Sequence, residues 1–504
     1  MNTLLETIPH LANIWIIIAA LIGVTCGILG GALPGISPSI TMALLLPFTY
    51  TMEPVAAIVM LAATYIGAEY GGSIPAILIR TPGTNAAAAT VLDGFAMNQQ
   101  GKAGLALGIS LYSGFIGSMF GLFLLMVLSG PLADVALAFT PPAYFALGVL
   151  GLSVIATLSG DSMVKGLIAA LFGLMLATIG TDPVTGSNRF TFGYSDLLSG
   201  IEPVLVMVGL FAMSELLVQA GDRNEVDRIT SRPRIEFPGR ALMRRLIRPQ
   251  AIGGSIGAFE GVMPGAGGTI ASFMAYNEAR RWSKNKDEFG HGSPEGIAAP
   301  ETANNTVAET ALVPLLAFGI PGSNSTAILL GGFLIHGLQP GPMLFEKSAD
   351  VIHGLYAGIF IAIIGMVLVG ITILPLCVWM VNRPRAYLNA FILALILSGI
   401  YTIHEGLTDV TLMLVAGAVG FFMRFLRFPF LPTVLGLVLG FLVESSFRRS
   451  LVMSGDDMSV FVGDWISIVL LSVAAIFIFG SVAKRTYDLF RPAATTGDAE
   501  KIKG

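Results

Sequence analysis

Charged residues are scarce in this chain. Only 12% of its 504 residues are Asp, Glu, Lys or Arg, whereas 54% are apolar, and the mean hydropathy is +0.79. Water-soluble globular chains carry about 25% charged residues, so the composition excludes a soluble fold. Several segments contain no charged residue, and each is long enough for the roughly 20 residues that cross a bilayer core. These segments are 11–52, 104–132, 135–160, 310–345, 356–381 and 465–483.

Cysteine is nearly absent as well. Cys26 and Cys377 lie in apolar segments, where a thiol acts as a small core residue, so we infer neither a disulfide nor a metal site. No G-x-x-x-x-G-K-[ST] phosphate loop occurs, and His404-Glu405 lacks the second His of H-E-x-x-H. No basic cluster suggests nucleic-acid binding. We therefore expect no cofactor, and an ion gradient rather than ATP as the energy source for any transport.

What the sequence does contain is a duplicated pattern of Gly and Pro. Residues 22–35 and 252–265 share the pattern I-G-x-[ST]-x-G-x-x-x-G-x-x-P-G, 230 positions apart. Residues 75–85 (P-A-I-L-I-R-T-P-G-T-N) and 314–324 (P-L-L-A-F-G-I-P-G-S-N) form a second pair, 239 positions apart. Duplicated, Gly/Pro-interrupted apolar segments are the best sequence indication of a transporter binding site. The offset grows from 230 to 239 positions, so the second half has nine extra residues between its two motifs. We expect them in a charged loop around 280–288.

These features predict an all-α, polytopic integral membrane protein. We expect about twelve hydrophobic elements in two inverted repeats, with discontinuous helices and re-entrant hairpins. The Arg-rich segment 222–249 predicts a cytoplasmic linker by the positive-inside rule. Residues 1–13 contain no Lys or Arg, so the first apolar segment is interpreted as a retained helix that starts on the opposite face. The predicted divisions are 1–221 and 250–483 for the two repeats, 222–249 for the linker and 484–504 for a cytoplasmic tail.

The broken segments can bind an anion. GxxxG spacing at Gly27/Gly31 and at Gly257/Gly261 allows close helix packing. Each Pro-Gly then interrupts a helix, which is tolerated in a membrane only inside protein or beside a water-filled cavity. Small side chains after the break leave backbone N–H groups accessible, and the next helix N-terminus favours a carboxylate. Packing sites and simple kinks are the alternative interpretation. The candidate substrate residues are Pro34, Gly35, Ser37, Ser39, Pro82, Gly83, Thr84, Asn85, Pro264, Gly265, Gly267, Gly268, Thr269, Pro321, Gly322, Ser323, Asn324, Ser325 and Thr326.

Ionisable and amide residues within apolar segments are candidates for ion coupling. A carboxylate in such a segment indicates proton coupling or cation binding by default, although a carboxylate at a helix end is the alternative. Amide oxygens suit a hard cation such as Na⁺. The candidates are Glu69, Glu301, Glu309, Asn304 and Asn305. We expect Asn304 and Asn305 to matter if the ion is Na⁺, and Glu69 or Glu309 if it is H⁺.

Several motifs together resemble one known family. They are P-E-G-I-A-A-P-E-T-A-N-N at 294–305, G-I-P-G-S at 319–323, H-G-L-Q-P-G-P at 336–342, Y-G-G-S-I at 70–74, P-G-T at 82–84, D-G-F at 93–95, and L-P-G at 33–35 with L-L-L-P at 44–47. The chain resembles the large membrane subunit of the tripartite tricarboxylate transporters (TctA family) from about residue 15 to 480. This chain differs from the family pattern at three positions. Ser37 stands where the family often has Gly, and Asn85 and Asn324 stand where it often has a small residue or Pro. We expect these side chains to tune selectivity.

The resemblance implies a secondary transporter of the bacterial inner membrane that takes up citrate or related carboxylates with Na⁺ or H⁺. It also implies a small membrane subunit of about four helices and a periplasmic solute-binding protein as partners, with membrane lipid around the chain. Two other classes stay open: an autonomous carboxylate carrier or exporter, and an intramembrane enzyme. The enzyme is disfavoured because no acid/base or metal constellation is visible. Ser323→Ala or Gly322→Leu is expected to abolish uptake.

Overall fold

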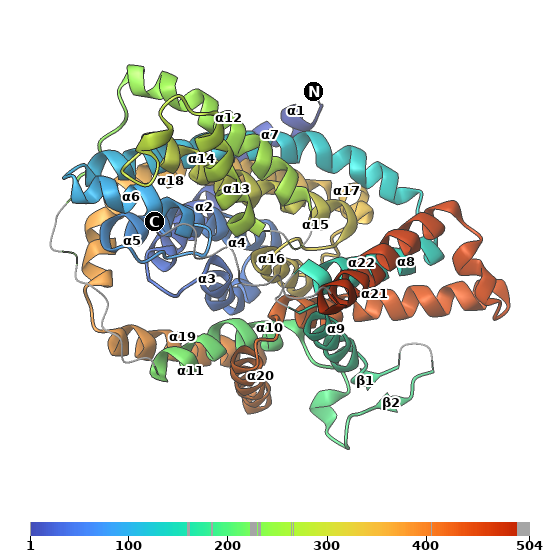
Figure 1. Ribbon diagram of the computed structural model, residues 1–504. Helices are drawn as coiled ribbons and strands as arrows, with labels where there is room; N and C mark the ends of the chain where they lie inside the picture. Colours follow the sequence, from blue (N-terminus) through green and yellow to red (C-terminus); the bar gives the residue numbers. More distant parts are fainter. Residues whose placement is uncertain are drawn as a thin grey trace.

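The computed structural model describes residues 2–158, 162–182, 185–221, 229, 233–263, 265, 267–404 and 406–490. Most of these residues are helical (Figure 1). Among them, nine helices are long and apolar enough to cross a membrane, and three shorter apolar helices accompany them. The prediction of an all-α polytopic membrane protein is confirmed. Parts of the predicted linker (222–228 and 230–232), part of the tail (491–504) and Pro264 lie outside the described residues.

The helices fall into two series with the same order. A short helix α1 (Asn2–Thr7) precedes the first series. The first series is α2 (Ile14–Gly31), α3 (Pro38–Leu45), α4 (Pro54–Gly71), α5 (Ser73–Ile79), α6 (Ala88–Gln99), α7 (Ala103–Leu137), α8 (Pro141–Leu158), α9 (Met163–Ala177), α10 (Pro203–Met207), the π-helix η4 (Val208–Met213) and α11 (Ser214–Gly221). The second is α12 (Arg240–Val262), α13 (Gly267–Trp282), α14 (Pro294–Thr310), α15 (Leu312–Phe318), α16 (Asn324–Ile335), α17 (Pro342–Lys347), α18 (Ala349–Val381), α19 (Arg385–His404), α20 (Leu407–Phe425), α21 (Phe430–Ser454) and α22 (Trp465–Phe490).

The backbone repeats the duplication that the sequence shows. Gly35 and Gly265, the last residues of the first motif pair, both have a positive φ, at 89° and 95°. Arg80 and Gly319, which are 239 positions apart, both end a short helix in the left-handed conformation, at φ 58° and 72°. In the first series, α3 continues into the 3-10 helix η2 (Leu46–Thr51), and two residues connect η2 to α4. In the second series, the connection from α13 to α14 is residues 283–293. The nine extra residues of the second series therefore lie in the predicted charged loop.

Glycines hold the first and third helix of each series together. A Cβ on Gly27 would overlap the Thr64 carbonyl oxygen of α4, and a Cβ on Gly257 would overlap the Ala303 carbonyl oxygen of α14. Gly31 and Gly261 also meet atoms of α4 and α14. The predicted close packing at both GxxxG motifs is confirmed, since only glycine leaves room for the opposing helix.

Gly27→Ala is expected to destabilise the protein by about 1–3 kcal/mol, because the added Cβ meets backbone that cannot move aside. Gly130 of α7 is the matched control, because its surroundings are open to a Cβ. Thermal unfolding in detergent should show a lower midpoint for Gly27→Ala and an unchanged one for Gly130→Ala. Equal midpoints for the two variants would contradict the packing argument.

The two series interlock at their ends. In Figure 1, α21 and α22 (red) lie beside α8, and α20 lies beside α10. Thus α21 packs on α8 and α9 of the first series, while α20 packs on α10, η4 and α11. A small antiparallel hairpin of β1 (Gly180–Thr181) and β2 (Asn188–Arg189) adds to this contact. Its Arg189 pairs with Glu444 of α21 at 2.8 Å, and Asp182 pairs with Arg448 at 3.0 Å.

Candidate functional site

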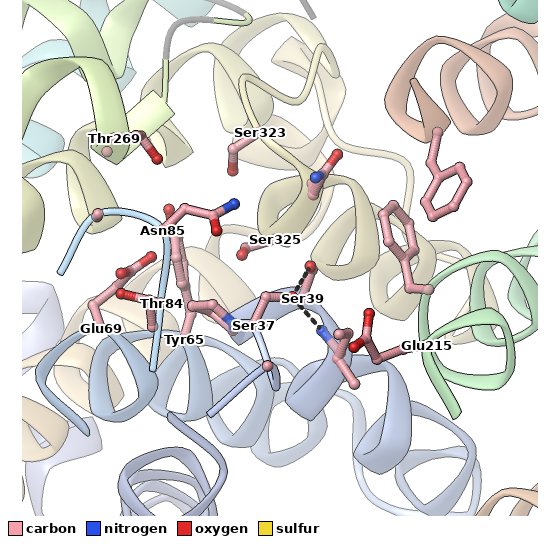
Figure 2. Close-up of a pocket in the computed structure, with 18 of the residues that line it drawn as sticks. Ser37, Ser39, Tyr65, Glu69, Thr84, Asn85, Glu215, Thr269, Ser323 and Ser325 are labelled. Carbon is pink, nitrogen blue, oxygen red and sulfur yellow. Dashed lines mark hydrogen bonds between the residues drawn. The ribbon is translucent and has the colours of Figure 1, made fainter. Parts of the chain in front are cut away.

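The four breaks meet around one cavity of about 390 Å³. Each break is followed by a helix. The first residues of α3, α13 and α16 contribute to the lining, as do Thr84, Asn85 and Ala86 in the turn that precedes α6 (Figure 2). The lining residues are Gly35, Ser37, Pro38, Ser39, Ile40, Tyr65, Glu69, Thr84, Asn85, Ala86, Phe211, Glu215, Gly268, Thr269, Ser323, Asn324, Ser325, Arg424 and Phe430. Residues more than 230 positions apart thus come together, as the duplicated motifs suggested.

Serine hydroxyls surround the start of α3. Ser37 is the N-cap, and its hydroxyl accepts a hydrogen bond of 3.4 Å from the Ile40 N–H. The hydroxyls of Ser37 and Ser39 are 2.9 Å apart (Figure 2). Pro38 occupies the first helical position, where its fixed φ suits the helix and no N–H is needed. The turn therefore presents two hydroxyls and a helix N-terminus to the cavity.

The start of α16 is arranged in a similar way. Ser323 and Thr326 form a capping box: the Ser323 hydroxyl accepts from the Thr326 N–H at 3.2 Å, and the Thr326 hydroxyl accepts from the Ser323 N–H at 2.8 Å. Ser323, Asn324 and Ser325 line the cavity, whereas Thr326 is fully buried beside them. Ser323 therefore caps α16, in addition to its predicted role in substrate binding. Ser325 lines the cavity but takes no part in the capping box.

The remaining two helix starts complete the lining. Thr84 accepts from the Ala87 N–H at 3.2 Å ahead of α6, with Asn85 next to it. Gly268 and Thr269 lie in the first turn of α13. A backbone bond of 2.8 Å from the Gly265 N–H to the Gly322 carbonyl joins the two breaks of the second series. The N-termini of α3, α13 and α16 each carry about half a positive charge.

A buried carboxylate also faces the cavity. Glu69 of α4 is only 7% exposed, and one of its oxygens accepts a bond of 3.0 Å from the side-chain amide of Asn304 on α14. The Asn304 Oδ1 atom is buried and accepts no hydrogen bond from the described residues. Gly268 lies against this atom, because a Cβ there would be 2.5 Å from it. Of the predicted ion residues, Glu69 therefore lines the cavity, and Asn304 lies directly behind the lining, in contact with Glu69 and Gly268.

The other predicted ion residues lie deeper in the same helix. The Glu301 carboxylate accepts hydrogen bonds from the hydroxyls of Thr90 and Ser110. The Asn305 amide donates to the Glu301 carbonyl at 2.9 Å, one turn earlier in the helix. Glu309 points at α7, between Ser118 and Gly121. All three are buried in α14 and do not line the cavity.

Some candidate substrate residues shape the breaks rather than the cavity surface. Gly83 packs on α2, where a Cβ would overlap the Gly31 carbonyl oxygen. Pro34 lines a separate small hollow beside α19. The candidates outside the lining are Pro34, Pro82, Gly83, Gly265, Gly267, Pro321, Gly322 and Thr326.

The motifs gave no indication of five lining residues that come from other parts of the chain. The Tyr65 hydroxyl lies within hydrogen-bonding reach of Ser323 and Ser325. Glu215 of α11 and Arg424 of α20 form an ion pair at the cavity. Phe211 and Phe430 supply apolar surface next to them. A charged residue within an otherwise apolar helix is the signal that could have pointed to Glu215 and Arg424.

This arrangement can bind a small anion together with a cation. Helix N-termini and hydroxyls favour carboxylates, while Glu69 and the Asn304 amide oxygen favour a cation or a proton. A multi-pass membrane protein with discontinuous helices around a polar cavity has the features of a secondary transporter. The chain belongs to the tripartite tricarboxylate transporter TctA family, because the family model matches residues 17–435. Membership makes it a transporter subunit and implies partner proteins.

Two proteins of Agrobacterium vitis are similar to this chain. An uncharacterized 52.8 kDa protein in the TAR-I ttuC' 3' region is 38% identical over 460 residues, which cover 91% of each chain. An uncharacterized protein in the TAR-II ttuC' 3' region is 35% identical over 220 residues, 44% of this chain and 91% of its own length. No solved structure matches the chain.

Proposed function

We propose that this chain is the large translocating subunit of a secondary transporter in the bacterial inner membrane. It imports citrate-like tricarboxylates or related carboxylates by symport with Na⁺ or H⁺. Its partners are a small four-helix membrane subunit and a periplasmic solute-binding protein. The observation that carries the proposal is the convergence of three helix N-termini (α3, α13 and α16) and the turn before α6, with their hydroxyls, on one cavity of about 390 Å³. That volume lies within the range of roughly 300–1,000 Å³ typical of small-molecule sites.

Glu69 supports the coupling to a cation. An ionised carboxylate in the same cavity would repel a carboxylate substrate, because like charges at close range in a poorly solvated site are unfavourable. Binding of Na⁺ between Glu69 and Asn304, or protonation of Glu69, removes this repulsion. The ion and the substrate then bind with positive cooperativity, which is the thermodynamic requirement for symport.

The experiment is uptake of labelled citrate, tricarballylate and succinate into proteoliposomes. They contain this chain and the small subunit, with or without the binding protein, under an imposed Na⁺ or H⁺ gradient. Gradient-driven uptake that needs the binding protein supports the proposal and identifies the ion. Uptake without the binding protein favours an autonomous carrier. Absence of uptake of every carboxylate by the folded complex contradicts the substrate class.

Ser325→Ala is expected to raise the KM for the transported carboxylate by about tenfold or more. The loss of one hydrogen bond to a charged group costs about 1.5–3 kcal/mol, and this hydroxyl lines the cavity without capping α16. Thermal stability should stay unchanged. Ser323→Ala should abolish uptake, as expected from the sequence, and should also lower stability by about 1 kcal/mol, because it removes the N-cap of α16. An unchanged KM in both variants would contradict this assignment.

A further inference from the structure

The ion pair of Glu215 and Arg424 has no part in the function proposed so far. Both residues line the cavity, and both lie in helices that are otherwise apolar over most of their length. Arg424 is the one Lys or Arg among the described residues of the lining. A charged residue at such a position is a functional candidate by default.

Glu215 is held in place from its own helix. Gln219, one turn later on α11, donates a side-chain bond of 2.9 Å to Glu215 Oε1, while Arg424 pairs with Oε2. The Glu215 side chain is 11% exposed, whereas that of Arg424 is 39% exposed. The guanidinium also lies 5.7 Å from the centre of the Phe430 ring. Arg424 is therefore the more accessible member of the pair, and its five N–H donors are more than one carboxylate uses.

We propose that Arg424 binds a second carboxylate of the substrate and that Glu215 competes for Arg424 in the empty carrier. The inference rests on the proposed function, since it names a subsite of the same cavity. The breaks before α3, α6, α13 and α16 supply neutral donors and helix N-termini, whereas Arg424 comes from a different helix and carries a full charge. A guanidinium forms strong paired hydrogen bonds with a carboxylate.

This subsite sets specificity. When the second carboxylate arrives, Arg424 exchanges one carboxylate partner for another, and Glu215 keeps its bond from Gln219. The charge of Glu215 then loses its ionic partner, which is unfavourable, so only a full negative charge on the substrate can offset the exchange. A substrate with a neutral amide in place of that carboxylate cannot displace Glu215. The carrier therefore selects substrates with at least two carboxylates.

The test compares the best-transported carboxylate of the panel above with its monoamide, in proteoliposomes that contain the complete transporter. The variants are Arg424→Gln, Arg424→Lys and Glu215→Gln, with Arg281→Gln as a control because Arg281 is 70% exposed in a surface pair. Arg424→Gln should raise the KM for the carboxylate by about tenfold or more and that for the monoamide far less. Arg424→Lys should restore part of the loss. Glu215→Gln should lower the KM for the carboxylate, because the competitor is gone.

Two results would overturn the inference. One is an unchanged carboxylate-to-monoamide ratio in Arg424→Gln. The other is an equal loss for both compounds together with a lower unfolding temperature, which indicates a structural ion pair. Failure of the proposed function is distinguishable, because it appears in the wild-type arm as the absence of any carboxylate uptake.

Discussion

Glu69→Gln is expected to abolish accumulation of the carboxylate against its gradient. The substitution keeps an oxygen for the Asn304 amide, which donates at 3.0 Å, but removes the charge that we propose binds the coupling ion. Each coupled charge contributes about 2.3 kcal/mol per 100 mV of membrane potential. Loss of one coupled cation therefore lowers the accumulation ratio about 50-fold at 100 mV. Exchange of labelled for unlabelled substrate should persist, since it needs no net movement of the ion.

The measurement is uptake into proteoliposomes with and without an imposed potential. Glu346→Gln is the control, because Glu346 is an exposed carboxylate of α17. Accumulation by Glu69→Gln at the wild-type level would exclude Glu69 as the coupling group. In that case Glu301 and Glu309, buried in α14, would be the next carboxylates to replace.

Gly268→Val is expected to eliminate substrate binding. Gly268 lies in the first turn of α13 at the cavity wall, and its Cβ would be only 2.5 Å from Asn304 Oδ1. The Asn304 amide must then move, which breaks its bond to Glu69, and the valine methyl groups fill part of the cavity. Both proposed sites, that for the ion and that for the anion, are then lost in one change. Uptake should fall to background, while the protein still reaches the membrane.

Binding of labelled carboxylate to the purified complex checks this prediction independently of the gradient. Gly130→Val is the matched control, since Gly130 is also in a helix but has open space around it. Wild-type affinity in Gly268→Val would show that the substrate does not occupy this part of the cavity.

The sequence predicted the repeat and the meeting of its breaks. Pro and Gly at equivalent positions fix where each helix ends, because Pro lacks an N–H and Gly35 and Gly265 adopt a positive φ. Inverted repeats, as predicted from the duplicated motifs, would place equivalent breaks on opposite sides of a pseudo-symmetry axis, where the four breaks can meet. Local chemistry and internal symmetry are both visible in a single chain. The cavity therefore includes Ser37, Thr84, Thr269 and Ser323, one from each break.

The other side of the cavity was not predictable in this way. Tyr65, Phe211, Glu215, Arg424 and Phe430 reach it from helices outside the two motifs. Which face of α11 or α20 points inward depends on how the end of one series packs on the other, and neither helix carries a pattern that specifies its neighbour. For the same reason the motifs did not distinguish Ser323, which caps α16, from Ser325, which does not. Hydrogen-bond partners of this kind are known only once the chain is folded.

The interlocked ends of the two series determine when the protein can finish folding. Helices α8 and α9 emerge early from the ribosome, but α21, on which they pack, is made only after the rest of the second series. At about 5–20 residues per second, this delay lasts on the order of tens of seconds. During that time Arg189 cannot yet pair with Glu444 of α21. Insertion into the membrane and completion of the tertiary fold are thus separate events, and a substitution in α21 affects the maturation of helices synthesised long before it.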